Sequence, residues 1–309
     1  MFSKILVPLD GSGTAEKVLP FVRCFARGLQ IPVELLGVVD IGEMARHISA
    51  DQAAMVRSLV DDSARRLDDY LQRTAKNFPT GKVECTVRHG NAAEVIIESA
   101  AADRQTLIAM ATHGRSGVDR WLLGSVTEKV LRAAANPMLI VRASEENSPG
   151  WHMGALKRVL VPLDGSKLSE SILPVAQALA RNLDLEIVLL SVYSNPFTLG
   201  TDGDGFYNAA QLQTILATLR AESMEYLALK AEELKKSGFS KVSSVAEEGR
   251  AADAIIASAQ RNPDCLVAMC THGRSGVKRW VLGSVTETVV RHLGAPVLVA
   301  RPTDLLPRD

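Results

Sequence analysis

The feature that most constrains the fold of this chain is an internal duplication. Residues 4–12, KILVPLDGS, recur as residues 158–166, RVLVPLDGS. Residues 112–128, THGRSGVDRWLLGSVTE, recur as residues 271–287 with changes at two positions only. The first pair is offset by 154 residues and the second by 159, which is far longer than the ~20 to 50 residues of a solenoid repeat. The sequence therefore predicts one domain present twice.

The boundary between the two copies is visible in the composition. Residues 143–157 are mostly polar, contain Ser-Pro-Gly and separate two apolar segments. Such a stretch is typical of a linker between domains. We therefore expect a first domain over residues 1–143, a linker over 144–156 and a second domain over 157–303.

Within each copy, short runs rich in Val, Ile and Leu alternate with segments of helical periodicity. Alternation of this kind, with strands that are apolar throughout, favours a parallel sheet covered by helices on both faces. We predict an α/β fold of two tandem doubly wound, Rossmann-like domains. In the first copy the expected strands are 5–9, 33–39, 82–88, 107–111 and 137–142, and the expected helices are 14–29, 50–76, 92–102 and 125–135.

The charge balance restricts the partners. The chain of 309 residues has 35 Lys and Arg against 35 Asp and Glu, a formal net charge of zero. This balance argues against nucleic acid and against an anionic membrane surface as partners. No secretory signal pattern and no long apolar run is visible, and the four cysteines have no paired CxxC spacing. We therefore predict a cytoplasmic protein that meets any charged ligand locally.

Both of the best-matched segments follow strands. In a doubly wound sheet, ligands bind beyond the carboxyl ends of the strands, where the strand order reverses. Asp10 follows the first strand, and the glycine-rich segment after Ala111 follows the fourth. One crevice between those two strands would therefore use both segments.

The glycine-rich segment ends at a predicted helix start, Gly124-Ser125-Val126-Thr127-Glu128. Free backbone N–H groups and the positive end of the helix dipole make such a start an anion site, and Arg115 adds a positive charge. The alternative is that Ser125-x-x-Glu128 and Ser284-x-x-Glu287 are capping boxes that need no ligand. We favour phosphate binding, because capping does not require the preceding glycines.

Other polar residues of these segments have two interpretations each. Asp10 and Asp164 suit a ribose hydroxyl or a cation, or alternatively an Asx turn after the strand. His113 and His272 are candidate phosphate donors, although a bond to backbone is the simpler role. Trp121 and Trp280 are best explained by packing. Neither a P-loop nor a Gly-x-Gly-x-x-Gly fingerprint is present.

These residues resemble the universal stress protein A family, in its tandem form, over nearly the whole chain. The most specific element is the Gly-x2-Gly-x9-Gly-Ser/Thr motif of the ATP-binding branch. Here it is Ala111-Thr-His-Gly114, nine residues and Gly124-Ser125, and again Cys270-Thr-His-Gly273, nine residues and Gly283-Ser284. The first glycine is therefore replaced by Ala111 and Cys270, which narrows the approach to a ligand without closing it.

The resemblance implies a five-stranded parallel sheet per domain and one adenine nucleotide per domain, ATP with Mg²⁺. It implies that Asp10 and Asp164 face ribose and phosphates, that Val38 and Val192 face adenine, and that the glycine loops and helix starts cradle the phosphates. The predicted contact residues are, in the first copy, Leu9, Asp10, Val38, Ala111, Gly114, Arg115, Gly124, Ser125, Val126 and Thr127, and in the second Leu163, Asp164, Val192, Cys270, Gly273, Arg274, Gly283, Ser284, Val285 and Thr286.

Family members commonly dimerise through the last strand, so the two copies are expected to form that dimer internally, residues 137–142 with 296–301, with larger homo-oligomers open. The leading hypothesis is a nucleotide-binding stress-response or signalling protein rather than an enzyme. Two alternatives remain. One is a slow enzyme that hydrolyses ATP or transfers its phosphate or adenylate, and the other is an interaction module with empty crevices.

Overall fold

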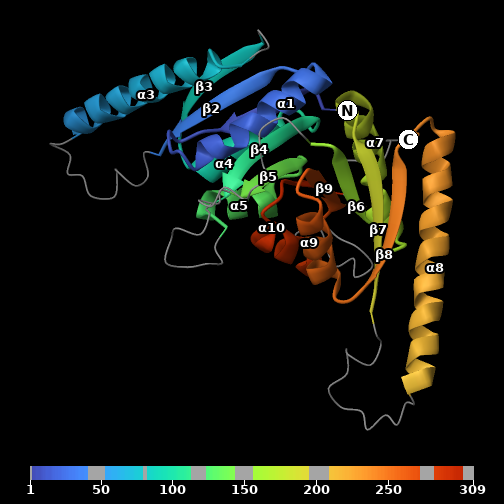
Figure 1. Cartoon of the computed structure of the whole chain (residues 1–309). Coiled ribbons are helices and arrows are strands. Elements are labelled where there is room, and N and C mark those ends of the chain that lie inside the picture. Colours follow the sequence, from blue (N-terminus) through green and yellow to red (C-terminus); the bar gives the residue numbers. More distant parts are fainter. Residues whose placement is uncertain are drawn as a thin grey trace. The chain divides into compact units, whose positions relative to one another are not determined.

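The chain divides into two compact units, Met1–Gly154 and Ala155–Asp309. The computed structural model (Figure 1) describes residues 2–40, 53–78, 82–112, 123–142, 156–194, 209–271 and 282–301. Apart from residue 156, the expected linker 144–156 lies outside the described residues. Each unit is described by itself below.

The first unit alternates strands and helices along the chain. Its elements are β1 (Lys4–Pro8), the 3₁₀ helix η1 (Ala15–Val18), α1 (Leu19–Leu29), β2 (Val33–Val39), α3 (Ala53–Ala75), β3 (Val83–His89), α4 (Ala92–Ala101), β4 (Thr106–Thr112), α5 (Ser125–Ala133) and β5 (Met138–Arg142). The predicted strands and helices are all present, with ends shifted by a few residues.

The second unit repeats this order. Its elements are β6 (Arg158–Pro162), α6 (Lys167–Glu170), α7 (Leu173–Leu183), β7 (Glu186–Tyr193), α8 (Ala209–Lys236), β8 (Val242–Glu248), α9 (Ala251–Arg261), β9 (Cys265–Cys270), α10 (Ser284–His292) and β10 (Val297–Ala300). Figure 1 shows the long helix α8 running beside β8, and α8 packs against both β7 and β8.

The strand order places the crevice where the sequence predicts it. The first unit has the order β3-β2-β1-β4-β5, and the second has β8-β7-β6-β9-β10, with parallel pairing within each unit. The chain thus moves outward from β1 to β3 and then crosses back to β4. Because such crossovers are right-handed, the helices before and after this reversal cover opposite faces of the sheet. The reversal lies at β1 and β4, and at β6 and β9.

The central strands form the core of each unit. Ile5, Leu6 and Val7 of β1 have no exposed surface, and neither have Leu107 and Ile108 of β4. The outermost strand β3, by contrast, is only partly buried along its length. Burial on both faces explains why the central strands are apolar at every position instead of at alternate ones.

One predicted helix is divided in two. The periodicity of residues 14–29 predicts a continuous helix, but the structure has a 3₁₀ turn up to Val18 and an α-helix from Leu19. Pro20 lies in the first turn of that helix. Proline has no N–H and cannot bond to the carbonyl four residues earlier, so the first turn closes as a separate element. Pro174 has the same place in α7 of the second unit.

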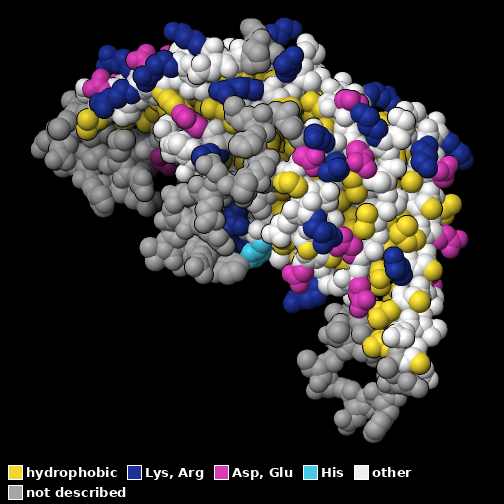
Figure 2. All heavy atoms as spheres, in the orientation of Figure 1, with side chains coloured by type: hydrophobic (Ala, Val, Ile, Leu, Met, Phe, Trp, Pro, Cys, Tyr) yellow, Lys and Arg dark blue, Asp and Glu magenta, His cyan; other side chains and the backbone are white. Residues whose placement is uncertain are grey.

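The described surface is mixed in charge. On the face shown in Figure 2, Lys and Arg side chains lie interspersed with Asp and Glu, as the zero net charge leads one to expect. Within the described ranges, no helix combines the length and the apolarity needed to span a bilayer.

Candidate functional site

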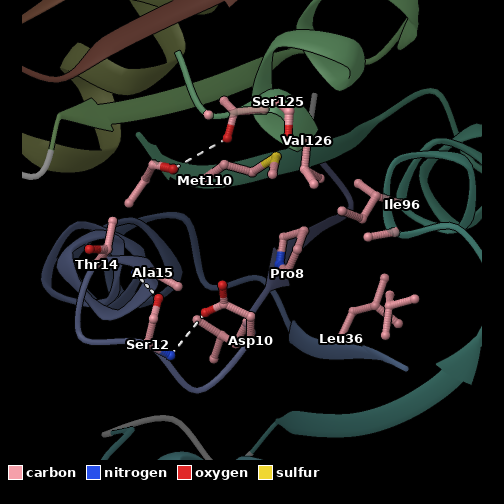
Figure 3. Close-up of a pocket in the computed structure, with 16 residues that line it drawn as sticks. Pro8, Asp10, Ser12, Thr14, Ala15, Leu36, Ile96, Met110, Ser125 and Val126 are labelled. Atoms are coloured by element: carbon pink, nitrogen blue, oxygen red, sulfur yellow. Dashed lines mark hydrogen bonds between the residues drawn. The ribbon is translucent and has the colours of Figure 1, made fainter. Parts of the chain in front are cut away.

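A cavity lies at the carboxyl ends of β1 and β4 in the first unit (Figure 3). Asp10 and Ser12 lie on one side of it, and Ser125 and Val126 at the start of α5 lie across from them. Of the predicted residues, Leu9, Asp10, Val38, Ala111, Gly124, Ser125, Val126 and Thr127 line this cavity. The structure therefore brings together all predicted residues of the first copy that it describes.

The second unit has an equivalent cavity between β6 and β9. The predicted residues Leu163, Asp164, Val192, Cys270, Gly283, Ser284, Val285 and Thr286 line it. The two cavities have volumes of about 170 Å³ and 290 Å³. Each unit thus repeats the same set of positions at the same place in its sheet.

Asp10 and Asp164 both begin a tight turn. The Asp10 carboxylate accepts a hydrogen bond from the backbone N–H of Ser12 at 2.9 Å, and the Asp164 carboxylate accepts one from Ser166 N–H at 3.0 Å. The intervening glycines, Gly11 and Gly165, have φ near +80°, which side-chain-bearing residues rarely adopt. The Asx-turn alternative is therefore confirmed, and both carboxylates still line their cavities.

The helix starts across each cavity lack the predicted capping boxes. Helices α5 and α10 begin at Ser125 and Ser284 themselves, and the N-caps are Gly124 and Gly283, which have no side chain to offer. Glu128 instead pairs with Arg132, and Glu287 pairs with Arg291, four residues further along each helix. The capping interpretation is wrong because each extended glycine supplies the cap one residue earlier than expected. The N–H groups of the first turn therefore gain no N-cap side chain.

Thr127 and Thr286 hold these helix starts against the sheet. The Thr127 hydroxyl donates to the carbonyl of Ala111 at 3.3 Å, and the Thr286 hydroxyl donates to the carbonyl of Cys270 at 2.9 Å. Both side chains are buried, with 4% and 2% of their surface exposed. Their hydroxyls position the helix relative to the strand end, so a ligand in the cavity would meet the backbone at these positions.

Cys270 takes the position of Ala111 in the second cavity. Its sulfur lies 3.1 Å from the hydroxyl of Ser171, and the residue is 5% exposed. Burial raises the pKa of the Cys270 thiol to about 11, against a smaller lowering by the contact with Ser171. The thiol is thus protonated at neutral pH and lines the cavity as a small, weakly polar group.

An apolar wall completes each cavity. In the first cavity this wall consists of Leu36 and Val38 of β2 and Ile96 of α4. In the second cavity the equivalent residues are Leu190, Val192 and Ile255, in the same order. Sequence reasoning missed the helix residues because no motif marks them. The internal duplication could have identified them, because Ile96 and Ile255 lie the same number of residues after the equivalent glycines Gly90 and Gly249.

Several predicted residues lie outside the described ranges. These are His113, Gly114, Arg115 and Trp121 in the first copy, and His272, Gly273, Arg274 and Trp280 in the second. Among the described residues, no group of three or more His, Cys, Asp or Glu side chains is arranged to hold a metal ion.

Comparison with known proteins agrees with this architecture. A universal stress protein of Mycobacterium tuberculosis is 27% identical over 303 residues, covering 96% of both chains. One from Methanocaldococcus jannaschii is 31% identical over 155 residues, covering 46% of this chain and 96% of its own. The crystal structure of a universal stress protein from Archaeoglobus fulgidus aligns with a TM-score of 0.70 at 23% identity, over 97% of this chain and 98% of its own.

The family model describes the two copies separately. The model of the universal stress protein family matches residues 1–142 and again residues 155–301. Each match spans the five strands of one unit. The chain therefore belongs to the universal stress protein family, as a tandem member with two such domains.

Proposed function

We propose that the protein binds one adenine nucleotide of the ATP class in each unit, as a stress-response or signalling protein. The observation that carries the proposal is the repeated juxtaposition, across one cavity, of a carboxylate and a helix start whose N-cap is a glycine. Asp10 faces the α5 start in the first unit, and Asp164 lines the cavity at the α10 start in the second. A phosphate chain accepts hydrogen bonds from such a helix start.

The chemistry of the lining suits the parts of a nucleotide. The apolar wall of Leu36, Val38 and Ile96 offers a surface for the flat base, while Asp10 is placed to accept from ribose hydroxyls. When bound, ATP would bring Mg²⁺, which prefers phosphate oxygens, water and one or two carboxylates. The glycine loops, with Arg115 and Arg274, remain predicted phosphate contacts.

Binding requires less of this site than catalysis does. The acidic side chains among the described lining residues are Asp10 and Asp164, one per cavity. Phosphate binding needs only the helix start and a cation, whereas hydrolysis also needs a positioned water. Slow hydrolysis or transfer remains the alternative, and the pairing of the last strands, larger oligomers and a cytoplasmic location remain predictions.

A stoichiometry experiment tests the proposal. The purified chain is denatured, and its supernatant is analysed for adenine nucleotide by anion exchange. Calorimetric titration with Mg·ATP then compares the wild type with Gly124→Leu, Gly283→Leu and the double variant. Gly124 has φ −51° and Gly283 has φ −61°, which leucine can adopt, and both residues line their cavities.

We expect two nucleotides per chain in the wild type, one in each single variant and none in the double variant. Gly294→Leu is the matched control, because a Cβ there meets nothing within 4 Å and the residue lies at the amino end of β10, whereas the cavities lie at the carboxyl ends of the strands. Absence of nucleotide in the extract, together with no binding at millimolar Mg·ATP, would overturn the proposal. Phosphate release during the titration would favour the enzymatic alternative.

A further inference from the structure

The loops that carry Asp10 and Asp164 have the same first residues but different anchors. Both continue as Asp-Gly-Ser, after which the first unit has Ala15 and Lys17 where the second has Ser169 and Ser171. In the first unit, the Ser12 hydroxyl accepts from Ala15 N–H at 3.1 Å, and the turn leads into a 3₁₀ helix. Ala15 has no hydroxyl with which to return a hydrogen bond to the loop.

In the second unit, serine hydroxyls close the loop on itself. The Ser166 hydroxyl donates to the Asp164 carboxylate at 2.6 Å and accepts from Ser169 N–H at 3.1 Å. The Ser169 hydroxyl donates to the carbonyl of Ser166 at 2.9 Å and accepts from Asp164 N–H at 3.3 Å. Ser169 is buried, and it also lines the cavity. Asp164 is thus held through both its side chain and its backbone.

A further contact anchors the second loop to its surroundings. The Ser171 hydroxyl lies 3.1 Å from the Cys270 sulfur at the end of β9, so the loop helix and the opposite cavity wall are in contact. Ala111 and Lys17 at the equivalent places of the first unit cannot form this pair.

The long helices add the last difference. Glu170 accepts from the Tyr226 hydroxyl at 2.9 Å and pairs with Lys230 at 3.1 Å, both on α8. In the first unit, Glu16 accepts from Tyr70 of α3 at 3.0 Å. Thr74 takes the place of Lys230 there, and its hydroxyl donates to its own helix.

We propose that the cavity of the second unit is preformed by this serine network, with Ser169 as the positioning residue for Asp164. The inference rests on the proposed function. A loop that is already ordered loses less conformational entropy when a ligand binds. The second unit therefore binds the nucleotide more tightly and fills first, while the first unit fills at higher concentration. The site of the second unit is then occupied already at low nucleotide concentration, whereas the occupancy of the first site rises with nucleotide concentration.

The exchange of one residue between the units tests this inference. Ser169→Ala gives the second loop the residue of the first, and Ala15→Ser does the reverse. Binding to the second site is titrated with Mg·ATP in the Gly124→Leu background, and binding to the first in the Gly283→Leu background. Hydrogen exchange of residues 164–172 and 10–18 is measured in the same proteins without nucleotide.

We expect slower exchange in residues 164–172 than in 10–18, and tighter binding at the second site. Ser169→Ala should speed exchange of its loop and weaken the second site by about five- to tenfold, because it removes both hydrogen bonds of the Ser169 hydroxyl, of which the one from Asp164 N–H positions Asp164 directly. Ala15→Ser should slow exchange of the first loop. The midpoint of thermal unfolding, followed in parallel, separates a positioning role from a loss of folding.

Equal affinity at the two sites, or an unchanged second site in Ser169→Ala, overturns the inference alone. If neither background binds Mg·ATP, the proposed function fails and the inference fails with it. If Ser169→Ala fails to fold, Ser171→Ala is used in its place, because it removes the contact with Cys270 at the outer end of the same loop.

Discussion

The polar contacts at the two ends of the strands differ between the first unit and the second. At the amino ends of the strands, the first unit uses Asn136, whose buried amide donates to the carbonyls of Ala100, Asp103 and Thr106. The second unit has Ala295 in that place; its Arg158 binds both Asp264 and Glu186, whereas the equivalent Lys4 of the first unit binds Glu34.

At the carboxyl ends, the two units differ again. There the second unit has the serines that hold Asp164, and the first has Ala15 and Lys17. Duplicated domains can therefore keep one backbone while the polar groups that order each end differ. The comparison predicts that packing contributes equally in the two units, and that polar contacts do not.

The largest effect is expected from the packing that the units share. Leu71 of α3 and Leu227 of α8 are both fully buried, one residue after the tyrosines that bind Glu16 and Glu170. Leu71→Ala and Leu227→Ala should each lower the free energy of unfolding of their unit by about 2 to 5 kcal/mol. Chemical denaturation followed by circular dichroism measures both. A large loss in one unit with almost none in the other would break the proposed equivalence.

A smaller effect is expected where the first unit alone has a buried amide. Asn136→Ala removes a buried amide donor that three carbonyls share, although those of Ala100 and Asp103 keep a backbone N–H donor, and it should cost about 1 to 3 kcal/mol in the free energy of unfolding. Asn182→Ala is the matched control, since its amide bonds an exposed carbonyl of its own helix. A cost no larger than that of the control would show that the amide does not order this end of the sheet.

The smallest effect concerns the ion pair that only the second unit has. Lys230 and Glu170 are 18% and 25% exposed, so solvent screens them less than it screens a surface pair. Lys230→Met should lower the free energy of unfolding by about 1 kcal/mol, because it leaves a half-buried carboxylate with one donor fewer.

Lys235→Met is the control for that change. Lys235 pairs with Glu232, and the two side chains are 50% and 59% exposed. Its substitution should change stability by less than about 0.5 kcal/mol. Equal effects of Lys230→Met and Lys235→Met on stability would show that Lys230 does not contribute to the difference between the two units.

The sequence predicts the layout of both cavities well, for a physical reason. Apolar runs identify strands buried on both faces, and strand order then places Asp10 opposite Ser125 without any knowledge of side-chain contacts. The sequence predicts poorly the features that depend on the local conformation of a single residue. Pro20 divides a periodic helix, and Gly124 rather than Ser125 caps α5.

The roles of hydroxyl groups were also beyond sequence reasoning. Thr127 and Ser125 are both polar residues of one motif, but only the structure shows that the Thr127 hydroxyl is used within the protein. The hydrogen bonds of Ser169 could not be predicted either, because the sequence does not show which partner a serine hydroxyl three residues after Asp-Gly-Ser reaches in the folded turn. Local contacts of this kind decide how two copies of one motif differ.

Equilibrium dialysis of the wild-type chain against labelled ATP with Mg²⁺ tests the central claim most directly. We expect two nucleotides bound per chain at saturation, filled in two separate steps. Saturation at two in a single step would contradict the difference between the units. No bound nucleotide up to millimolar concentration would contradict both the proposed nucleotide binding and the difference between the two sites that rests on it.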